Sequence, residues 1–140
     1  MGWMPAAGTD LGDRLRRHLE QDRVAWLTSV GADGTPQPNP VWFIVEGEEI
    51  LVWNAARAHR LNHIRSRPRV ALNFNSTRTG GDILIITGEA HLDESAPLPH
   101  EVPAYVEKYG AEMKSISGTQ EAFSKSYPHL LRIRPDGVRE

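Results

Sequence analysis

Residues 24–53, VAWLTSVGADGTPQPNPVWFIVEGEEILVW, decide the fold. Apolar and polar residues alternate over residues 24–30, which predicts a half-buried β-strand. The turn-forming sequence ADGT connects this strand to a second one at residues 37–45, as in a β-hairpin. Another short turn leads into a third apolar strand at residues 50–53. Strands joined by such short turns favour antiparallel neighbours in one sheet.

Three prolines, Pro36, Pro38 and Pro40, recur at every second position of the middle strand. Alternate residues of a strand direct their N–H groups to the same edge, so all three missing donors lie on one edge. We therefore expect this strand to pair fully on one side only. Trp42 is the first residue beyond the prolines whose N–H points to the open edge, where water, another element or a ligand must meet it. The alternative is that the prolines only protect an edge strand from aggregation.

The rest of the chain adds helices and three further strands. We expect helices at residues 10–22, with Asp10 as a candidate N-cap, and at 56–67, 103–109 and 119–126. Strands are expected at 69–75, 82–92 and 130–134. Six antiparallel strands with few helices favour a small closed barrel, because closure removes exposed sheet edges. With no internal repeat, the 140 residues are expected to form one domain, 1–140.

Composition excludes several classes of function. The chain has no cysteine, which removes thiolate nucleophiles, redox CxxC motifs and iron–sulfur clusters. A net charge of -2 argues against a general nucleic-acid binder, which is normally basic. No run of about 18 apolar residues occurs, so we expect no membrane span and a cytoplasmic location.

Five arginines and no acidic residue lie between residues 57 and 69. Arg57 and Arg60 fall in the first turn of the helix expected there, where free backbone N–H groups favour an anion. The guanidinium fork also matches phosphate oxygens, so these two predict a phosphate site. For Arg65, Arg67 and Arg69 we favour a solvated helix face.

Two histidines, His59 and His63, are four residues apart and could share a helix face. No third ligand is spaced to join them, so we expect a solvated or phosphate-contacting histidine and no metal site. GxSxG, GxGxxG, Walker and HExxH motifs are all absent from the sequence. If the protein is an enzyme, the absence of these motifs favours a phosphate-bearing organic cofactor that supplies the reactivity. We assign no catalytic side chain.

The order of three segments resembles a known family. AWLTSVGADGTPQPNPVWF, ILVWNAARAHRLNHIRSRPRVAL and ITGEAHL are similar to the split-barrel flavin-binding family related to pyridoxamine 5'-phosphate oxidase, and within it to the F420-dependent reductases. The resemblance covers about residues 10–93 well and the tail to residue 135 more loosely. It implies a mainly β, six-stranded antiparallel split barrel with short flanking helices. It also implies a homodimer that holds a cofactor in each cleft between protomers.

The resemblance also implies which residues bind the cofactor. The flavin ring would lie along the strand that carries Asn39, Pro40, Val41, Trp42 and Phe43. The phosphate would lie after the next strand, at Asn54 and Ala55, and beside Arg57, His59 and Arg60. The family usually has lysine at the position of Arg60, eight residues before Pro68, and the serine or threonine often found beside the phosphate is not matched.

Apolar residues occupy both faces of the strand at residues 37–45. Val41, Phe43 and Val45 share one face, and Trp42 and Ile44 share the other, which leaves neither face for water. A homodimer would cover the second face, so the residues themselves also predict one.

The leading interpretation is an oxidoreductase in which reduced deazaflavin F420 passes a hydride to an electron-poor C=C or C=O of a small organic substrate. An FMN-dependent oxidoreductase of the same fold is the first alternative. A non-catalytic module that binds a flavin or a phosphorylated ligand is the second. A regulator that binds RNA is the third alternative. It is the least favoured, because the sequence lacks the basic residues interleaved with aromatic ones that such a surface needs. Pyridoxamine 5'-phosphate oxidation itself is not expected, because the substrate-binding C-terminal segment of that enzyme has no match here.

Overall fold

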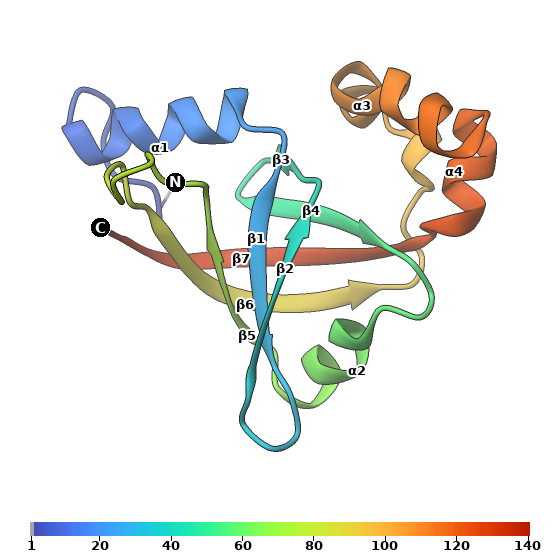
Figure 1. Cartoon of the computed structure of the whole chain (residues 1–140), viewed down its shortest axis with the longest axis horizontal. Coiled ribbons are helices and arrows are strands. Elements are labelled where there is room, and N and C mark those ends of the chain that lie inside the picture. The colour runs from blue at the N-terminus through green and yellow to red at the C-terminus, as the bar shows by residue number, and fades with distance from the viewer. Residues whose placement is uncertain (1) are drawn as a thin grey trace.

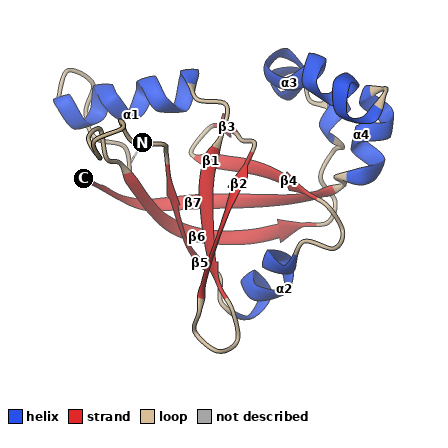
Figure 2. Ribbon diagram, viewed as in Figure 1, coloured by secondary structure: helices blue, strands red, loops and turns tan. Residues whose placement is uncertain are grey.

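In the computed structural model, which describes residues 2–140, one antiparallel sheet of seven strands curves around a core with four α-helices beside it (Figures 1 and 2). The strands are β1 (Ala25–Val30), β2 (Pro36–Val41), β3 (Ile44–Glu46), β4 (Glu49–Asn54), β5 (Arg69–Asn73), β6 (Ile85–Asp93) and β7 (His129–Arg139). The helices are α1 (Asp10–Gln21), α2 (His59–Ser66), α3 (Pro103–Ser117) and α4 (Gln120–Ser126), with a short 3₁₀ helix at Pro99–Glu101.

The strand expected at residues 37–45 is in fact two strands, which is why the sheet has seven strands and not six. The strand order is β2-β1-β5-β6-β7-β4-β3, so β2 and β3 lie at opposite edges. Only Trp42 and Phe43 separate them in the sequence. Three Cα–Cα steps of about 3.8 Å keep the two edges within about 11 Å of each other. The break in the strand therefore closes the sheet into the expected mainly β barrel.

The proline pattern has the predicted consequence. Each proline of β2 lies opposite a residue of β1 between Trp26 and Val30, and only the intervening residues of β2 have N–H groups that can bond to β1. β1 is the sole partner strand of β2 within residues 2–140. The edge without donors is therefore the open edge, and every residue of β2 except Val41 is exposed.

Side chains of β4 alternate between two hydrophobic clusters. Ile50 and Val52 point into the barrel, where they join the inner cluster with Leu15 of α1. Leu51 and Trp53 point outward into a second cluster under α3 and α4. Figure 1 shows these two helices on the outside of the barrel, beside the ends of β4 and β7.

The outer cluster changes the argument for a homodimer. Trp42 stacks on Tyr109 of α3, with ring centroids 4.5 Å apart, and on Phe123 of α4, at 5.5 Å. The second apolar face of the segment at residues 41–45 is therefore covered by helices of the same chain. A homodimer stays a prediction, but this face does not require it.

Several element boundaries differ from expectation. Thr9, not Asp10, caps α1, because its side chain accepts a hydrogen bond from the Gly12 N–H. α2 begins at His59 after a turn closed by the bond from Ala58 N–H to Ala55 O (3.1 Å), so Arg57 precedes the helix. α3 continues to Ser117 and β7 continues to Arg139.

β7 passes Pro135 without breaking because its partner strand carries a glycine opposite. Pro135 pairs with Gly88 next to a register shift in β6. A Cβ at Gly88 would lie 2.5 Å from the Arg134 carbonyl oxygen, so this crossing needs glycine.

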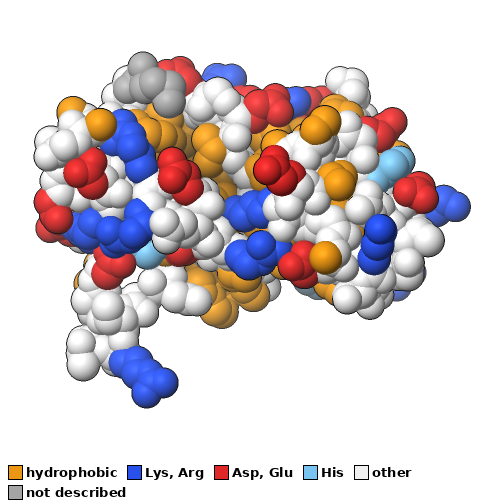
Figure 3. Space-filling model, turned by 90° about the horizontal axis from the view of Figure 1, so that it is seen from above, with side chains coloured by type: hydrophobic (Ala, Val, Ile, Leu, Met, Phe, Trp, Pro, Cys, Tyr) orange, Lys and Arg blue, Asp and Glu red, His pale blue; other side chains and the backbone are white. Residues whose placement is uncertain are grey.

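The surface mixes charges of both signs. Figure 3 shows acidic and basic side chains close to one another on the face seen from above, with hydrophobic side chains between them. None of the helices within residues 2–140 is both long and apolar enough to cross a lipid bilayer.

Candidate functional site: two cavities that share Arg60

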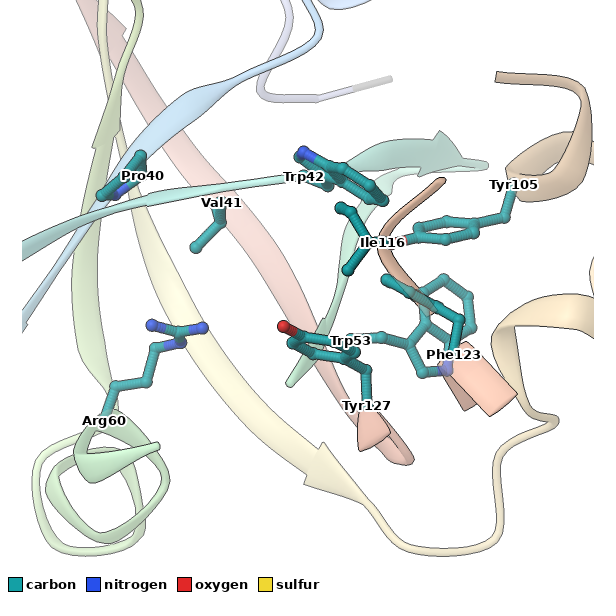
Figure 4. Close-up of a pocket in the computed structure, with 9 residues that line it drawn as sticks. All are labelled: Pro40, Val41, Trp42, Trp53, Arg60, Tyr105, Ile116, Phe123 and Tyr127. Atoms are coloured by element: carbon teal, nitrogen blue, oxygen red, sulfur yellow. The ribbon is translucent and has the colours of Figure 1, made fainter. Parts of the chain in front are cut away.

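Two cavities adjoin at one arginine. The first, which we call the aromatic cavity, has a volume of about 240 Å³ and lies between β2, β4 and the outer helices (Figure 4). Its lining residues are Pro40, Val41, Trp42, Trp53, Arg60, Tyr105, Ile116, Phe123 and Tyr127. The second, the basic cavity, has a volume of about 250 Å³. Its lining residues are Ser29, Gln37, Asn39, Arg57, Ala58, His59, Arg60 and His63.

Arg60 carries a charge that no acidic side chain balances. It is the second residue of α2, it is half-buried, and its Nε donates a hydrogen bond to Asn54 Oδ1. Burial lowers the pKa of the Arg60 guanidinium from its ordinary value. No carboxylate within residues 2–140 lies within 4.0 Å of it. A cation that is partly removed from water and lacks a counter-ion is unfavourable, so a bound anion would stabilise the protein at this position.

Asn54 fixes the direction of that arginine. The Asn54 side chain is 0% exposed, and its Nδ2 donates to the carbonyl oxygens of Val52 (2.8 Å) and His129 (3.0 Å). Both amide hydrogens are thereby used, so Oδ1 must face Arg60. The last residue of β4 therefore positions Arg60 at the boundary of the two cavities.

The basic cavity is lined by cationic and neutral polar side chains. Arg57 precedes α2, and His59 and His63 lie one turn apart on it. His63 Nδ1 lies 3.2 Å from the Ser29 hydroxyl of β1. No acidic residue lines this cavity. Its composition suits an anionic group with several oxygen atoms, such as a phosphate.

The later arginines of the same segment have other partners, and of these three only Arg65 lies on an exposed helix face as expected: Arg67 is half-buried at the end of α2, and Arg69 begins β5. Arg65 is exposed and lies 3.6 Å from Glu94, and Arg69 is exposed and pairs with Asp136. Arg67 Nε donates to the Val30 carbonyl oxygen (2.9 Å). Of the five arginines, Arg57 and Arg60 line the two cavities of the candidate site, and Arg65 lines a separate one beside Glu94.

The structure brings together most of the residues that the sequence indicated. Three of those residues, Phe43, Asn54 and Ala55, line neither cavity. The residues found in the aromatic cavity are Pro40, Val41, Trp42 and Arg60; those found in the basic cavity are Asn39, Arg57, His59 and Arg60, with Asn54 in contact with Arg60.

Phe43 has a structural position. Its side chain is 0% exposed inside the barrel, and its N–H donates to Tyr109 Oη (3.0 Å). Its carbonyl oxygen accepts a bond from Lys108 Nζ (2.9 Å). Burial lowers the pKa of Lys108 to about 8 and raises the pKa of Tyr109 to about 12. The backbone polar groups of Phe43 are thus both bonded to side chains of α3.

The sequence did not indicate the helical side of the aromatic cavity. Tyr105 and Ile116 come from α3, Phe123 comes from α4, and Tyr127 follows it. The four-residue spacing of Tyr105 with Tyr109, and of Phe123 with Tyr127, was a signal for one apolar helix face. That pattern does not say which part of the barrel the face covers.

A metal centre finds no support in the geometry. Within residues 2–140, no three histidine or carboxylate side chains lie close enough together to hold a metal ion. The site instead consists of an aromatic cavity, a cationic cavity and an exposed strand edge beside them.

Comparison with known proteins identifies the family of this fold. Residues 11–140 match the family model described as pyridoxamine 5'-phosphate oxidase. No curated protein matches the sequence significantly.

Several solved structures share the fold. One is an F420 reductase, with 20% identity, a TM-score of 0.68, and coverage of 86% of this chain and 92% of that chain. The General Stress Protein 26 of Bacillus anthracis has 18% identity and a TM-score of 0.67, covering 93% and 92%. HutZ of Vibrio cholerae, a heme storage protein, has 15% identity and a TM-score of 0.64, covering 94% of both chains.

At these identities the solved structures show the fold alone, and proteins with this fold include both a reductase and a heme storage protein. Within residues 2–140 the family model extends over all seven strands and, except for Asp10 of α1, all four helices. The chain therefore belongs to the pyridoxamine 5'-phosphate oxidase family.

Proposed function

We propose that this protein is an oxidoreductase that uses reduced deazaflavin F420 to reduce an electron-poor C=C or C=O group of a small organic molecule. The observation that carries the proposal is Arg60, a half-buried cation without an acidic partner between the basic cavity and the aromatic cavity. When bound, a reduced deazaflavin would supply the hydride. The protein would supply the binding site, the orientation and the exclusion of water.

The residues present fit the phosphate of such a cofactor. Arg57, His59 and Arg60 surround a cavity without carboxylates, so an anion would enter without repulsion. Asn54 already accepts the Arg60 Nε hydrogen bond, and the remaining guanidinium N–H groups make no hydrogen bond within residues 2–140, so they can bind oxygen atoms of a ligand. The preformed orientation reduces the entropy lost on binding.

The exposed edge of β2 fits the ring of the cofactor. Pro36, Pro38 and Pro40 prevent another strand from pairing there, so the backbone of this edge stays accessible to a flat molecule. Asn39 of the same strand lines the basic cavity, and Val41 lines the aromatic cavity. A ring along residues 39–42 would thus connect a phosphate at Arg60 to a substrate in the aromatic cavity.

Titration with F420 and with FMN, at low and high salt, tests the proposed cofactor. F420 carries an acidic tail that adds contacts to exposed cations such as Arg57, so we expect it to bind about tenfold more tightly than FMN at low salt. High salt should reduce that preference.

The reduced complexes are then exposed to air. A deazaflavin has carbon where a flavin has N5, and its reduced form resists oxygen. Preference for FMN at both salts, with rapid reoxidation, would favour the FMN-dependent alternative. Binding of both cofactors without reduction of any electron-poor acceptor would favour the non-catalytic binding module.

We also propose that two copies of the chain form a homodimer. A groove of about 550 Å³ runs over the outer face of β1, β5 and β6, and among its lining residues Ile83 is 46% exposed. A second copy would bury the apolar residues of this groove, such as Ile83, together with polar ones such as Asn73. Sedimentation velocity at micromolar concentration should give twice the chain mass, and Ala71→Arg, within the groove, should give the monomer mass. A wild-type monomer would contradict the proposal.

A further inference from the structure

We propose that His18 is a proton-controlled latch: as an imidazolium it holds the loop between β5 and β6, residues 74–84, against α1, and loss of its proton releases that loop. This inference goes beyond the proposed cofactor site, which uses neither His18 nor the loop. The exposed Ile83 of this loop also lines the groove over β1, β5 and β6. The latch would therefore control the surface of the proposed homodimer, and that consequence rests on the homodimer.

His18 is buried between two carboxylates. It is only 7% exposed, and its ring stacks on Phe74 with centroids 4.9 Å apart. Nδ1 lies 2.6 Å from Asp22 Oδ2, and Nε2 lies 2.8 Å from Asp82 Oδ2. An ionised carboxylate can only accept hydrogen bonds, so both ring nitrogens must carry hydrogen, and the ring is an imidazolium.

The loop is bonded to α1 mainly through one residue, Asp82. Figure 1 shows the loop between β5 and β6 beside α1. Within residues 2–140, every hydrogen bond from α1 to this loop ends on the Asp82 carboxylate or on the Ile83 carbonyl oxygen. Burial alone would raise the pKa of Asp82, but the hydrogen bonds from Arg14 and His18 hold it below its ordinary value. The carboxylate therefore stays ionised at neutral pH.

The backbone at Asp82 is held in an unfavourable conformation. Its φ is 55°, and among residues 2–140 it is the only residue other than glycine with a positive φ. Such a conformation persists only where surrounding contacts maintain it. The tip of the loop is a separate turn with its own bonds, from Thr77 N–H to Gly81 O (3.0 Å) and from Gly81 N–H to Thr77 Oγ1 (2.7 Å). The tip can therefore keep its turn when Asp82 leaves α1.

A neutral His18 cannot bond to both carboxylates, because a neutral imidazole has one N–H. Asp22 directly follows α1, and its backbone N–H donates to the His18 carbonyl oxygen (2.9 Å), so it stays with the helix. Asp82 belongs to the loop and would face a nitrogen lone pair with a carboxylate, which is repulsive. Loss of the proton therefore moves Asp82 away from His18, and Ile83, the next residue, moves with it.

His18 is the group of this cluster that changes charge near neutral pH, because histidine is the side chain that ordinarily titrates there. The other members are arginines and carboxylates, which keep their charges in that range. The charged groups around His18 in the described part of the chain are Arg14, Arg17 and Asp22 of α1, Asp82 of the loop, and Asp10 and Glu140, which pair with Arg14.

NMR of the ¹⁵N-labelled, cofactor-free protein follows the ring and the loop together, from mildly acidic to mildly alkaline pH. The ring nitrogen shifts of His18 report its charge, and the amide signals of residues 79–84 report the loop. We expect the loop signals to change with the same midpoint as the His18 ring. Constant loop signals while His18 loses its proton would overturn the latch, and so would a His18 ring that keeps its charge over the whole range.

Three variants assign the effect to this cluster. Asp82→Asn should keep the loop in place at every pH, because an amide can donate to the neutral ring and accept from the charged one. His18→Gln should remove the loop titration, and His91→Gln, an exposed residue of β6, is the matched control that should retain it. If His18→Gln does not unfold cooperatively in urea, Asp82→Asn decides, since it keeps the buried histidine. A loop titration that persists in Asp82→Asn would overturn the latch.

Sedimentation velocity over the same pH range measures the consequence for association. As His18 loses its proton, the dissociation constant of the wild-type dimer should rise by about 10-fold or more, the effect of one hydrogen bond to a charged group. An equal rise in Asp82→Asn would overturn the link to association. A monomer at every pH, with the loop still following His18, would contradict the homodimer and support the latch. Titration with F420 or FMN tests the cofactor site separately, because neither His18 nor Asp82 lines it.

Discussion

Tyr109→Ala is expected to lower the free energy of unfolding by about 3–5 kcal/mol, the range found when a large buried aromatic residue is truncated. Tyr109 is 0% exposed and packs against both Trp42 and Tyr105. Its removal would leave a cavity between α3 and the link that joins β2 to β3. Because that link closes the barrel, the loss should affect the whole sheet and appear as one cooperative transition in urea.

Tyr109→Phe isolates the contribution of the hydroxyl. Tyr109 Oη accepts the Phe43 N–H (3.0 Å) and donates to the Arg23 carbonyl oxygen (2.6 Å). The phenylalanine variant keeps the ring and leaves the Phe43 N–H without its partner, so we expect a loss of about 1–3 kcal/mol.

The matched control is Tyr127→Phe, which removes a hydroxyl that has no bond within residues 2–140. We expect that substitution to change the free energy of unfolding by less than about 0.5 kcal/mol. Equal stability of the two phenylalanine variants would show that the Tyr109 hydroxyl does not hold the link.

The barrel could be predicted because its causes are local. Alternation at residues 24–30 shows one buried face, and prolines at every second position show which edge of the next strand stays open. Both patterns depend only on strand geometry. No local sequence pattern indicates the break between Val41 and Ile44. The break depends on Tyr109, which is 66 residues away in the sequence and hydrogen-bonds to Phe43.

The same distinction applies to the candidate site. The sequence set Arg57 and Arg60 apart by placing both in the first turn of a helix from residue 56, but α2 begins at His59, so Arg57 precedes it. Among the described residues the structure gives Arg65 and Arg69 acidic partners and leaves Arg60 without one. The apolar pattern at residues 41–45 showed that both faces are covered. It could not show that α3 and α4 cover one of them, so the helical wall of the aromatic cavity was missed.

Arg60→Ala is expected to weaken binding of the phosphate-bearing cofactor by about 1.5–3 kcal/mol, which is roughly 10- to 150-fold in the dissociation constant. The guanidinium is partly removed from water and has no competing carboxylate, so a phosphate would regain interactions that the folded protein lacks. Arg60→Lys keeps the charge and loses the fork and the bond to Asn54, so an intermediate loss is expected.

Arg65→Ala is the matched control, because Arg65 lies on the same helix, is exposed, and faces Glu94 at 3.6 Å. It should weaken cofactor binding by less than about 0.5 kcal/mol. Fluorescence titration of the wild type and the three variants at one salt concentration measures all the affinities. Equal losses at Arg60 and Arg65 would mean that the segment acts as a diffuse charged surface, and the assignment of the phosphate to Arg60 would be wrong.

The stability of the same variants gives an independent check on Arg60. A guanidinium without a carboxylate partner loses hydration on folding, so its replacement removes that cost but leaves the buried Asn54 Oδ1 without its partner; because the two effects oppose each other, we expect the free energy of unfolding of the cofactor-free protein to fall by no more than about 1–3 kcal/mol. Added cofactor should then stabilise the wild type more than Arg60→Ala, since stabilisation follows the ratio of ligand concentration to dissociation constant. A variant that binds weakly and is also much less stable would indicate that Arg60 supports the fold and that its effect on binding is indirect.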